Sequence, residues 1–162
     1  MLTDAGFIEP RHFTTEDLPA LVRLHRLAFP GVPCCARYFV RQAARPGRHI
    51  KIFINEHGQA VGFMIFDVRA VYARLRKIGV HPHCRQRGIA TKAIRWLADP
   101  LFPLHRERIV AAVAGTDTLA QRLLRAAGLR CARIERRPDQ PDRYHFGWQR
   151  RTPALTAASA RR

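Results

Sequence analysis

The period of the apolar residues changes along this sequence, and that change restricts the fold more than any other feature. In about 14 residues that end before Pro30, and in residues 36–44, the apolar side chains recur at helical spacing. Residues 50–55 alternate and residues 60–68 are almost continuously apolar, as in strands, and residues 57–58 between them predict a turn. The first half of the chain is therefore expected to form two helices followed by a β-hairpin, with a further short strand before the first helix.

The second half alternates between strand and helix signals. The expected elements are, in order, a strand at 72–80, a helix at 88–97, a strand at 109–113, a helix at 118–127 and strands at 131–135 and 144–149. Where helices begin to separate the strands, the sheet is expected to change from antiparallel to parallel. The order of elements predicts an α+β, or mixed α/β, domain.

Length and composition predict one domain. The chain has 162 residues with 10 Gly and 11 Pro, and no segment repeats at a solenoid period. We expect a single domain over residues 1–149 and a basic, flexible tail over 150–162. No apolar run is long enough to cross a membrane and no secretory segment is evident near Met1, so a cytoplasmic protein with reduced cysteines is expected. The adjacent Cys34 and Cys35 lack metal-site spacing and are interpreted as structural or incidental thiols.

The charge balance is strongly positive. The 29 basic residues outnumber the 12 acidic ones, for a formal net charge of +17. Such a charge attracts polyanions and suggests RNA, DNA or a ribosome as a partner. However, only three of the basic residues are lysines (Lys51, Lys77, Lys92), and a GC-rich genome would also produce this excess of arginine. Both interpretations stay open at this stage.

Residues 78–90 carry the most informative motif, a strand that continues through a basic loop into a helix. The first N–H groups of a helix are unpaired, and the helix dipole favours an anion there. Gly88 would let an anion approach closely, and Arg85 and Arg87 add charged donors. Neither G-x-x-x-x-G-K-[ST] nor G-x-G-x-x-G is present. The segment therefore predicts a pyrophosphate site of another type.

The residues Arg85-x-x-Gly88-x-Ala90 match the pattern R/Q-x-x-G-x-G/A, and residues 80–82 form the V-x-P turn that often precedes it. On these residues the chain resembles the GNAT superfamily of acyl-CoA-dependent N-acyltransferases, over about residues 7–149. The resemblance implies a central mixed sheet of about six to seven strands flanked by about four helices. It also implies acetyl-CoA, or another acyl-CoA, as the acyl donor.

The same resemblance implies a cofactor site around the motif. The end of the strand would pair with the pantetheine arm, and the backbone amides of the loop would hold the pyrophosphate. The expected cofactor-binding residues are Ile78, Gly79, Val80, Arg85, Gln86, Arg87, Gly88, Ile89, Ala90 and Thr91.

The sequence departs from the family at the catalytic positions. Residues 113–129 resemble the block N-x-x-A-x-x-L-Y-x-x-x-G-F, but Leu124 stands where many members have a tyrosine that protonates the leaving thiolate. The usual positions of a glutamate base fall at Arg74 and near Ala112, neither of which accepts a proton at neutral pH. Either water and proximity suffice, or other residues act, or the site is not catalytic.

Several other residues are candidates for the chemistry. Tyr72 and Tyr144 are phenols that could serve as an acid, or each could be a half-buried strand residue. Asp117 could act as a base, bond a cofactor amide or simply cap the following helix. Arg74 and Tyr144 are also candidates for substrate binding.

The remaining polar residues each have two interpretations. Arg74, Arg76 and Lys77 could bind an acidic substrate or be solvated strand residues, and Glu56 and Asp67 could meet an amine substrate or be solvated turn acids. His81, His83 and Cys84 lack a distant fourth ligand, so no metal site is expected.

Two functions follow from these observations. The first is an enzyme that transfers an acetyl group from acetyl-CoA to an amine of a protein, peptide or RNA-associated acceptor, by direct attack in a ternary complex. The second is a GNAT-like fold that has lost its acid and base and binds nucleic acid or a ribosome through its arginines. A monomer or homodimer without membrane contact is expected in either case.

Overall fold

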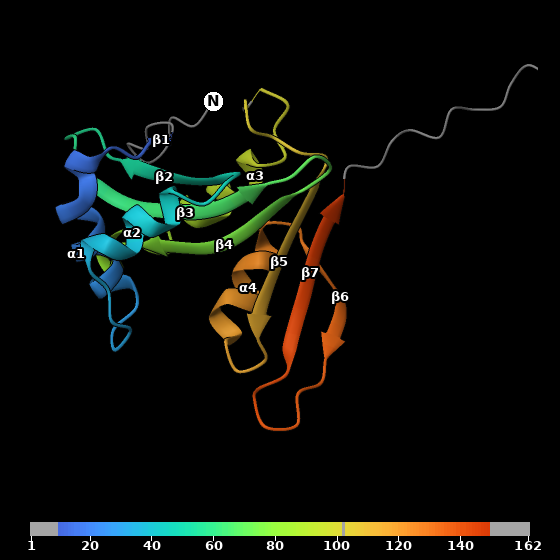
Figure 1. Cartoon of the computed structure of the whole chain (residues 1–162). Helices are drawn as coiled ribbons and strands as arrows, with labels where there is room; N and C mark the ends of the chain where they lie inside the picture. The colour runs from blue at the N-terminus through green and yellow to red at the C-terminus, as the bar shows by residue number, and fades with distance from the viewer. Residues whose placement is uncertain (1–9, 102, 150–162) are drawn as a thin grey trace, which may run out of the picture.

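A seven-stranded mixed sheet, in the order β1-β2-β3-β4-β5-β7-β6, forms the centre of the molecule (Figure 1). The computed structural model describes residues 10–101 and 103–149, so the predicted tail at 150–162 lies outside the described residues. The strands are β1 Arg11–His12, β2 Arg48–Ile54, β3 Ala60–Val68, β4 Ala73–Val80, β5 Arg108–Ala114, β6 Arg130–Glu135 and β7 Arg143–Gln149. Four α-helices and two 3-10 turns connect them: η1 Thr15–Asp17, α1 Leu18–Ala28, α2 Ala36–Ala43, η2 Pro82–Cys84, α3 Ile89–Trp96 and α4 Thr118–Ala126.

The predicted α+β fold and order of elements are confirmed. Strands β1 to β4 pair antiparallel, β4 and β5 pair parallel, and β7 pairs antiparallel with both β5 and β6. The expected change from antiparallel to parallel therefore falls between β4 and β5, where α3 connects them. The predicted helix before Pro30 begins as the 3-10 turn η1, and α1 itself starts at Leu18 and ends at Ala28.

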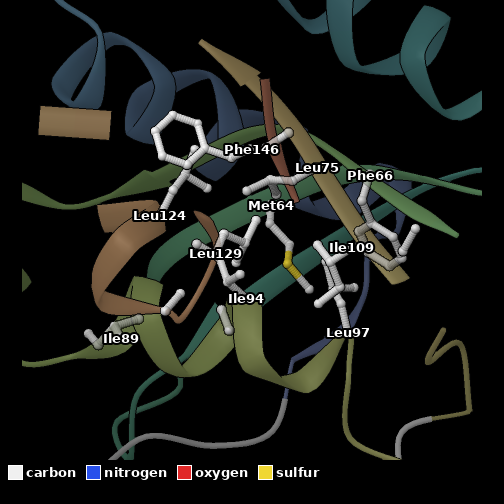
Figure 2. Packing of buried hydrophobic residues seen from close by; sticks show 14 of the residues in the cluster. Met64, Phe66, Leu75, Ile89, Ile94, Leu97, Ile109, Leu124, Leu129 and Phe146 are labelled. Carbon is white, nitrogen blue, oxygen red and sulfur yellow. The ribbon is translucent and has the colours of Figure 1, made fainter. Parts of the chain in front are cut away.

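The sheet is covered by helices on two faces, each with its own core. On one face α1 and α2 pack over β2 and β3, with Leu21, Phe39, Ile52 and Phe63 fully buried between them. On the other face α3 and α4 pack through the residues that Figure 2 shows in close contact: Met64, Phe66, Leu75, Ile89, Ile94, Leu97, Ile109, Leu124, Leu129 and Phe146. Burial of these side chains is the main force that holds the layers together.

Strands β4 and β5 separate shortly after they begin. They pair only over residues 73–75 and 109–111, whereas β4 continues to Val80 and stays paired with β3. The β3–β4 register shifts so that Arg76 is an extra residue in β4, a bulge that bends the strand at this point. Figure 1 shows the two strands diverging into a split that opens toward the start of α3. Below, "the split" means residues 76–80 of β4 and 112–114 of β5.

The helices that cover the sheet are short, and α1 has 11 residues. Within the described ranges, 10–101 and 103–149, no helix is long and apolar enough to cross a membrane.

Candidate active site

The split leaves part of the backbone of β4 without a strand beside it. Within the described residues, β5 offers no paired partner to positions 76–80. At about 3.3 Å per residue this open stretch is roughly 16 Å long. Backbone N–H and C=O groups along such an edge readily pair with an extended ligand. Ile78, Gly79 and Val80, predicted to bind the cofactor through their backbone, all lie on this stretch.

The open edge leads directly into the predicted anion-binding turn. Gln86 and Gly88 have left-handed φ angles of 61° and 74°, so the backbone reverses sharply before α3 begins at Ile89. Turns of this kind present successive N–H groups to one side and bind anions. Gly88 caps α3 without any side-chain hydrogen bond, which leaves the first N–H groups of the helix, from Ile89 to Thr91, available to a ligand.

Two glycines are required here for different reasons. The φ of 74° makes Gly88 the natural residue at its position, and an added Cβ would meet only Lys92, at 3.9 Å. Gly79 has no such angle, but an added Cβ would lie 2.8 Å from the Phe63 ring and 3.1 Å from Ala28 and Phe29. Helix α1 therefore crosses β4 so closely that only glycine fits beneath it.

The arginines of the turn differ in what they do. The Arg85 side chain points back toward α1, where its Nε donates to the Val80 carbonyl and its terminal nitrogen donates to the Ala28 carbonyl, both at 3.3 Å. Arg85 thus ties the turn to the end of α1. Arg87 is exposed at the tip of the turn and remains the predicted charged donor for a bound anion.

The other predicted site residues are not all brought to the split. Tyr72 lies just before β4, at the end away from the turn, and Arg74 is exposed with its guanidinium 5.6 Å from the Tyr72 ring centre. Asp117 caps α4, its Oδ1 accepting a hydrogen bond from the Ala120 N–H at 3.0 Å. Tyr144 is half-buried on β7, next to Gly115 and on the face of α3 and α4. Roles for these residues in acid-base chemistry or substrate binding stay predictions.

Asp67 does not lie in solvent as a turn acid. Its side chain is 2% exposed and receives Arg48 Nε at 2.6 Å and Arg76 Nε at 2.7 Å, and Arg48 also donates to Gln42. Burial alone would raise the pKa of Asp67, but the hydrogen bonds from the two arginines hold it below its ordinary value. The expectation that Asp67 is solvated was wrong because α2 and β2 cover it.

Lys77 likewise is not a solvated strand residue. Its Nζ lies 3.0 Å from His25 Nε2 and 4.9 Å from the ring centre of Phe29. His25 is 1% exposed, and its Nδ1 has no hydrogen-bond partner among the described residues. Burial lowers the pKa of His25 and the charge of Lys77 lowers it further, while burial also lowers the pKa of Lys77. A neutral His25 therefore accepts a hydrogen bond from the Lys77 ammonium.

Leu124 is a core residue. It is 2% exposed and lies in the cluster with Phe146 and Ile94 (Figure 2). Because leucine has no hydroxyl, this position of α4 offers no proton donor to the split. The proton for a leaving thiolate would have to come from elsewhere.

The histidines and cysteines of the sequence are dispersed. The rings of His81 and His83 lie 5.3 Å apart beside η2, and the His83 N–H donates to His81 Nδ1. Within the described part of the chain, no three His, Cys, Asp or Glu side chains are grouped so as to hold a metal ion. Cys34 and Cys35 are free thiols in the segment between α1 and α2, and burial raises the pKa of Cys34.

The tertiary structure adds a polar pair that sequence reasoning missed. His145 Nε2 lies 2.8 Å from Glu135 Oε2, which joins β7 to β6. The pairing of β5 with β7 sets His145 directly beside Ala112. Alternation along residues 144–149 could have indicated that His145 faces away from the core, but its proximity to Ala112 depends on the strand order, which periodicity does not reveal.

Comparison with protein families identifies the class to which this fold belongs. The model of the acetyltransferase (GNAT) family matches residues 18–129, well over half of the chain. The chain therefore belongs to the GNAT acetyltransferase family, and the resemblance seen in the sequence is confirmed. No curated protein matches the sequence significantly.

Solved structures share the fold. The ribosomal-protein-S18-alanine N-acetyltransferase from Escherichia coli is 20% identical, with a TM-score of 0.73 over 91% of this chain and 97% of that one. A mutant of a spermidine N-acetyltransferase from Vibrio cholerae is 12% identical, with a TM-score of 0.71 over 90% and 95% of the two chains. An acetyltransferase from Thermus thermophilus is 19% identical, with a TM-score of 0.69 over 87% and 96%. At these identities the similarity shows a common fold.

Proposed function

We propose that this protein is an acetyl-CoA-dependent N-acetyltransferase that transfers the acetyl group directly to an amine of a protein or peptide. The observation that carries the proposal is the continuity of the open edge of β4 with the turn at Gly88. An extended pantetheine arm fits an unpaired strand edge, and a pyrophosphate fits a helix start with free N–H groups. Family membership supports the same donor.

Different residues of the site would bind different parts of acetyl-CoA. The backbone of residues 78–80 would hold the extended arm, and the N–H groups of residues 86–91 would hold the pyrophosphate. Arg85 would keep the turn in place through its bonds to Val80 and Ala28. Acetyl-CoA supplies an activated thioester, and holding it beside the amine is the main contribution that this geometry makes.

The charge near the split supports an acidic or RNA-associated acceptor. The α1–α2 face of β4 carries the basic side chains of Arg74, Arg76 and Lys77, and Asp67 offsets only part of their charge. This face would repel a polycation and attract a carboxylate or phosphate. The structural neighbours include both an enzyme for an alanine of ribosomal protein S18 and one for spermidine. The charges favour an acceptor of the first kind.

Calorimetric titration with acetyl-CoA tests the donor site. The change Gly88→Glu places a carboxylate in the proposed pyrophosphate site, and we expect the affinity to fall by at least about 100-fold because the carboxylate repels the pyrophosphate at close range. The matched control is Gly128→Glu, at a second left-handed glycine where an added Cβ would also meet only one side chain, at 3.9 Å. This control should bind acetyl-CoA as the parent does.

The outcomes separate the two functions considered. Equal affinity of the parent and a folded Gly88→Glu protein would exclude this turn as the pyrophosphate site. A parent that binds no acetyl-CoA would overturn the enzyme and leave the nucleic-acid-binding alternative. Acetyl-CoA binding together with amine acetylation, measured by mass spectrometry, would establish the transferase.

A further inference from the structure

A transfer to an amine needs a group that can remove a proton, because an ammonium has no lone pair with which to attack. Arg74 and Ala112 stand where such a base is usual in the family, and neither can serve. Asp67 is occupied by two arginines, and Asp117 by the cap of α4. None of these four residues can take the proton, so we looked for a candidate base elsewhere on the sheet.

The register of the sheet places His145 beside the closed end of the split, where β4 and β5 begin to separate. Ala111 is the last residue of β5 that pairs with β4, and Ala112, the next one, pairs with His145 of β7. Side chains of directly paired residues lie about 5 Å apart at Cβ. His145 is therefore one strand away from the point where β4 and β5 separate.

His145 lies on the open face of this part of the sheet. Phe146 faces the core of α3 and α4, so the alternation of the strand turns His145 to the opposite face. On that face α1 and α2 cover β2 to β4, and the His145 side chain remains 31% exposed. An acceptor that approaches the split from the α1–α2 face would meet this ring.

Glu135 orients the His145 ring. The distance of 2.8 Å from Nε2 to Oε2 fits a hydrogen bond in which Nε2–H donates to the carboxylate, which leaves Nδ1 with the free lone pair. The hydrogen bond with His145 lowers the pKa of Glu135, and nearby Arg133 also lowers it, so the carboxylate stays charged. A histidine held by a carboxylate is a common arrangement for a general base.

We propose that His145, oriented by Glu135, is the general base that takes the proton from the acceptor amine; this rests on the proposed function. His145 Nδ1 takes one proton from the ammonium, directly or through one water. The amine nitrogen then bonds to the acetyl carbon as the carbon–sulfur bond breaks. A second N–H proton passes to the leaving thiolate to give the free thiol, and His145 releases its proton to water.

The charged groups around His145 set the conditions for this role. Glu135 and Arg133 face it from β6, and Arg143 lies two residues away on the same face of β7. The paired residue of β5, Ala112, carries no charge. Across the split, β4 carries the positive side chains of Arg74, Arg76 and Lys77, which favour a neutral imidazole over a charged one.

The test compares two substitutions that separate chemistry from structure. His145→Phe keeps a planar ring without nitrogens, and His145→Gln keeps an N–H donor for Glu135 but cannot take up a proton. The probe acceptor is a synthetic peptide with a free N-terminal alanine followed by glutamates, and kcat/KM is measured from pH 6 to 9.5. His57→Gln, at an exposed turn histidine, is the control.

We expect both substitutions to lower kcat/KM by about 100-fold at pH 7. The loss should shrink toward pH 9.5, because an α-amino group with a pKa of about 8 is then already neutral. NMR titration supplies a readout without turnover: the pKa of Glu135 should rise in His145→Phe and return toward the parent value in His145→Gln. Acetyl-CoA affinity should not change in either protein.

The other possible results would contradict the role of His145 as general base. They can be distinguished from a failure of the proposed transferase function. Variants with kcat/KM within about threefold of the parent, or with a loss that is the same at every pH, would overturn the role of His145. Rescue of the rate by His145→Gln would reduce His145 to a structural residue. A parent that binds acetyl-CoA but acetylates no amine would also overturn the base, whereas a parent that binds no acetyl-CoA would overturn the proposed function itself.

Discussion

The two halves of the sheet present the same face to different surroundings. In the half formed by β1 to β4, helices α1 and α2 cover this face, and Asp67 of β3 and His25 of α1 are buried between the helices and the sheet. In the half formed by β5, β7 and β6, the same face carries Glu135 and His145 partly in solvent. Both halves hold a carboxylate with basic partners. The buried Asp67 is expected to contribute to stability, whereas the partly exposed Glu135 can take part in the proposed chemistry through His145.

The largest effect on stability is expected from removing the buried carboxylate. Asp67→Ala would leave Arg48, whose side chain is only 8% exposed, without its ionic partner. Breaking a buried ion pair from one side costs about 3–5 kcal/mol in the free energy of unfolding. Urea denaturation measures this loss. The matched change on the open face, Glu135→Gln, should leave the denaturation midpoint where it is, and equal losses in the two variants would remove the distinction between the halves.

A smaller loss of stability is expected from a substitution in the core on the opposite face of the β5–β7–β6 half. Leu124→Tyr adds a ring and a hydroxyl to the packed cluster with Phe146, and overpacking of a core costs about 1–3 kcal/mol. Thermal denaturation tests this. A variant with full stability and a faster transfer rate would show that the hydroxyl reaches the split and that Leu124 occupies a catalytic position.

The smallest effect concerns the pH dependence of stability in the covered half. Burial lowers the pKa of His25, so the unfolded chain binds a proton more readily than the folded one. The stability due to a neutral His25 is present above the unfolded pKa of about 6.5 and is lost as the pH falls. Burial also lowers the pKa values of His12 and His49, so they add to the same trend.

Denaturation midpoints measured between pH 7 and pH 5 test this contribution. They should fall with pH in the parent and fall less steeply in His25→Phe. His57→Gln, at the exposed turn, should retain the slope of the parent. An unchanged slope in His25→Phe would mean that the buried ring takes up a proton without opposing the fold.

Much of the fold follows from the sequence alone. The change of period near residue 50 predicted the helices and strands, and residues 85–90 predicted a turn into a helix start, which the structure has with Gly88 in a left-handed conformation. That this turn binds an anion stays a prediction. These signals are local: an apolar period or a glycine in a turn acts on neighbours in the chain, so it can be interpreted without knowing the sheet.

What only the tertiary structure decided was which polar residues meet. Asp67 meets Arg48 from 19 positions away, and Lys77 meets His25 from 52 positions away, because α1 and α2 fold over β2 to β4. His145 lies beside Ala112 because β7 inserts between β5 and β6. Strand order and helix crossing depend on packing between distant segments, and the periodicity of the sequence does not reveal that packing. The sequence therefore predicted where the donor binds, and the packing of the sheet brought together the residues that we propose as the base and its partner.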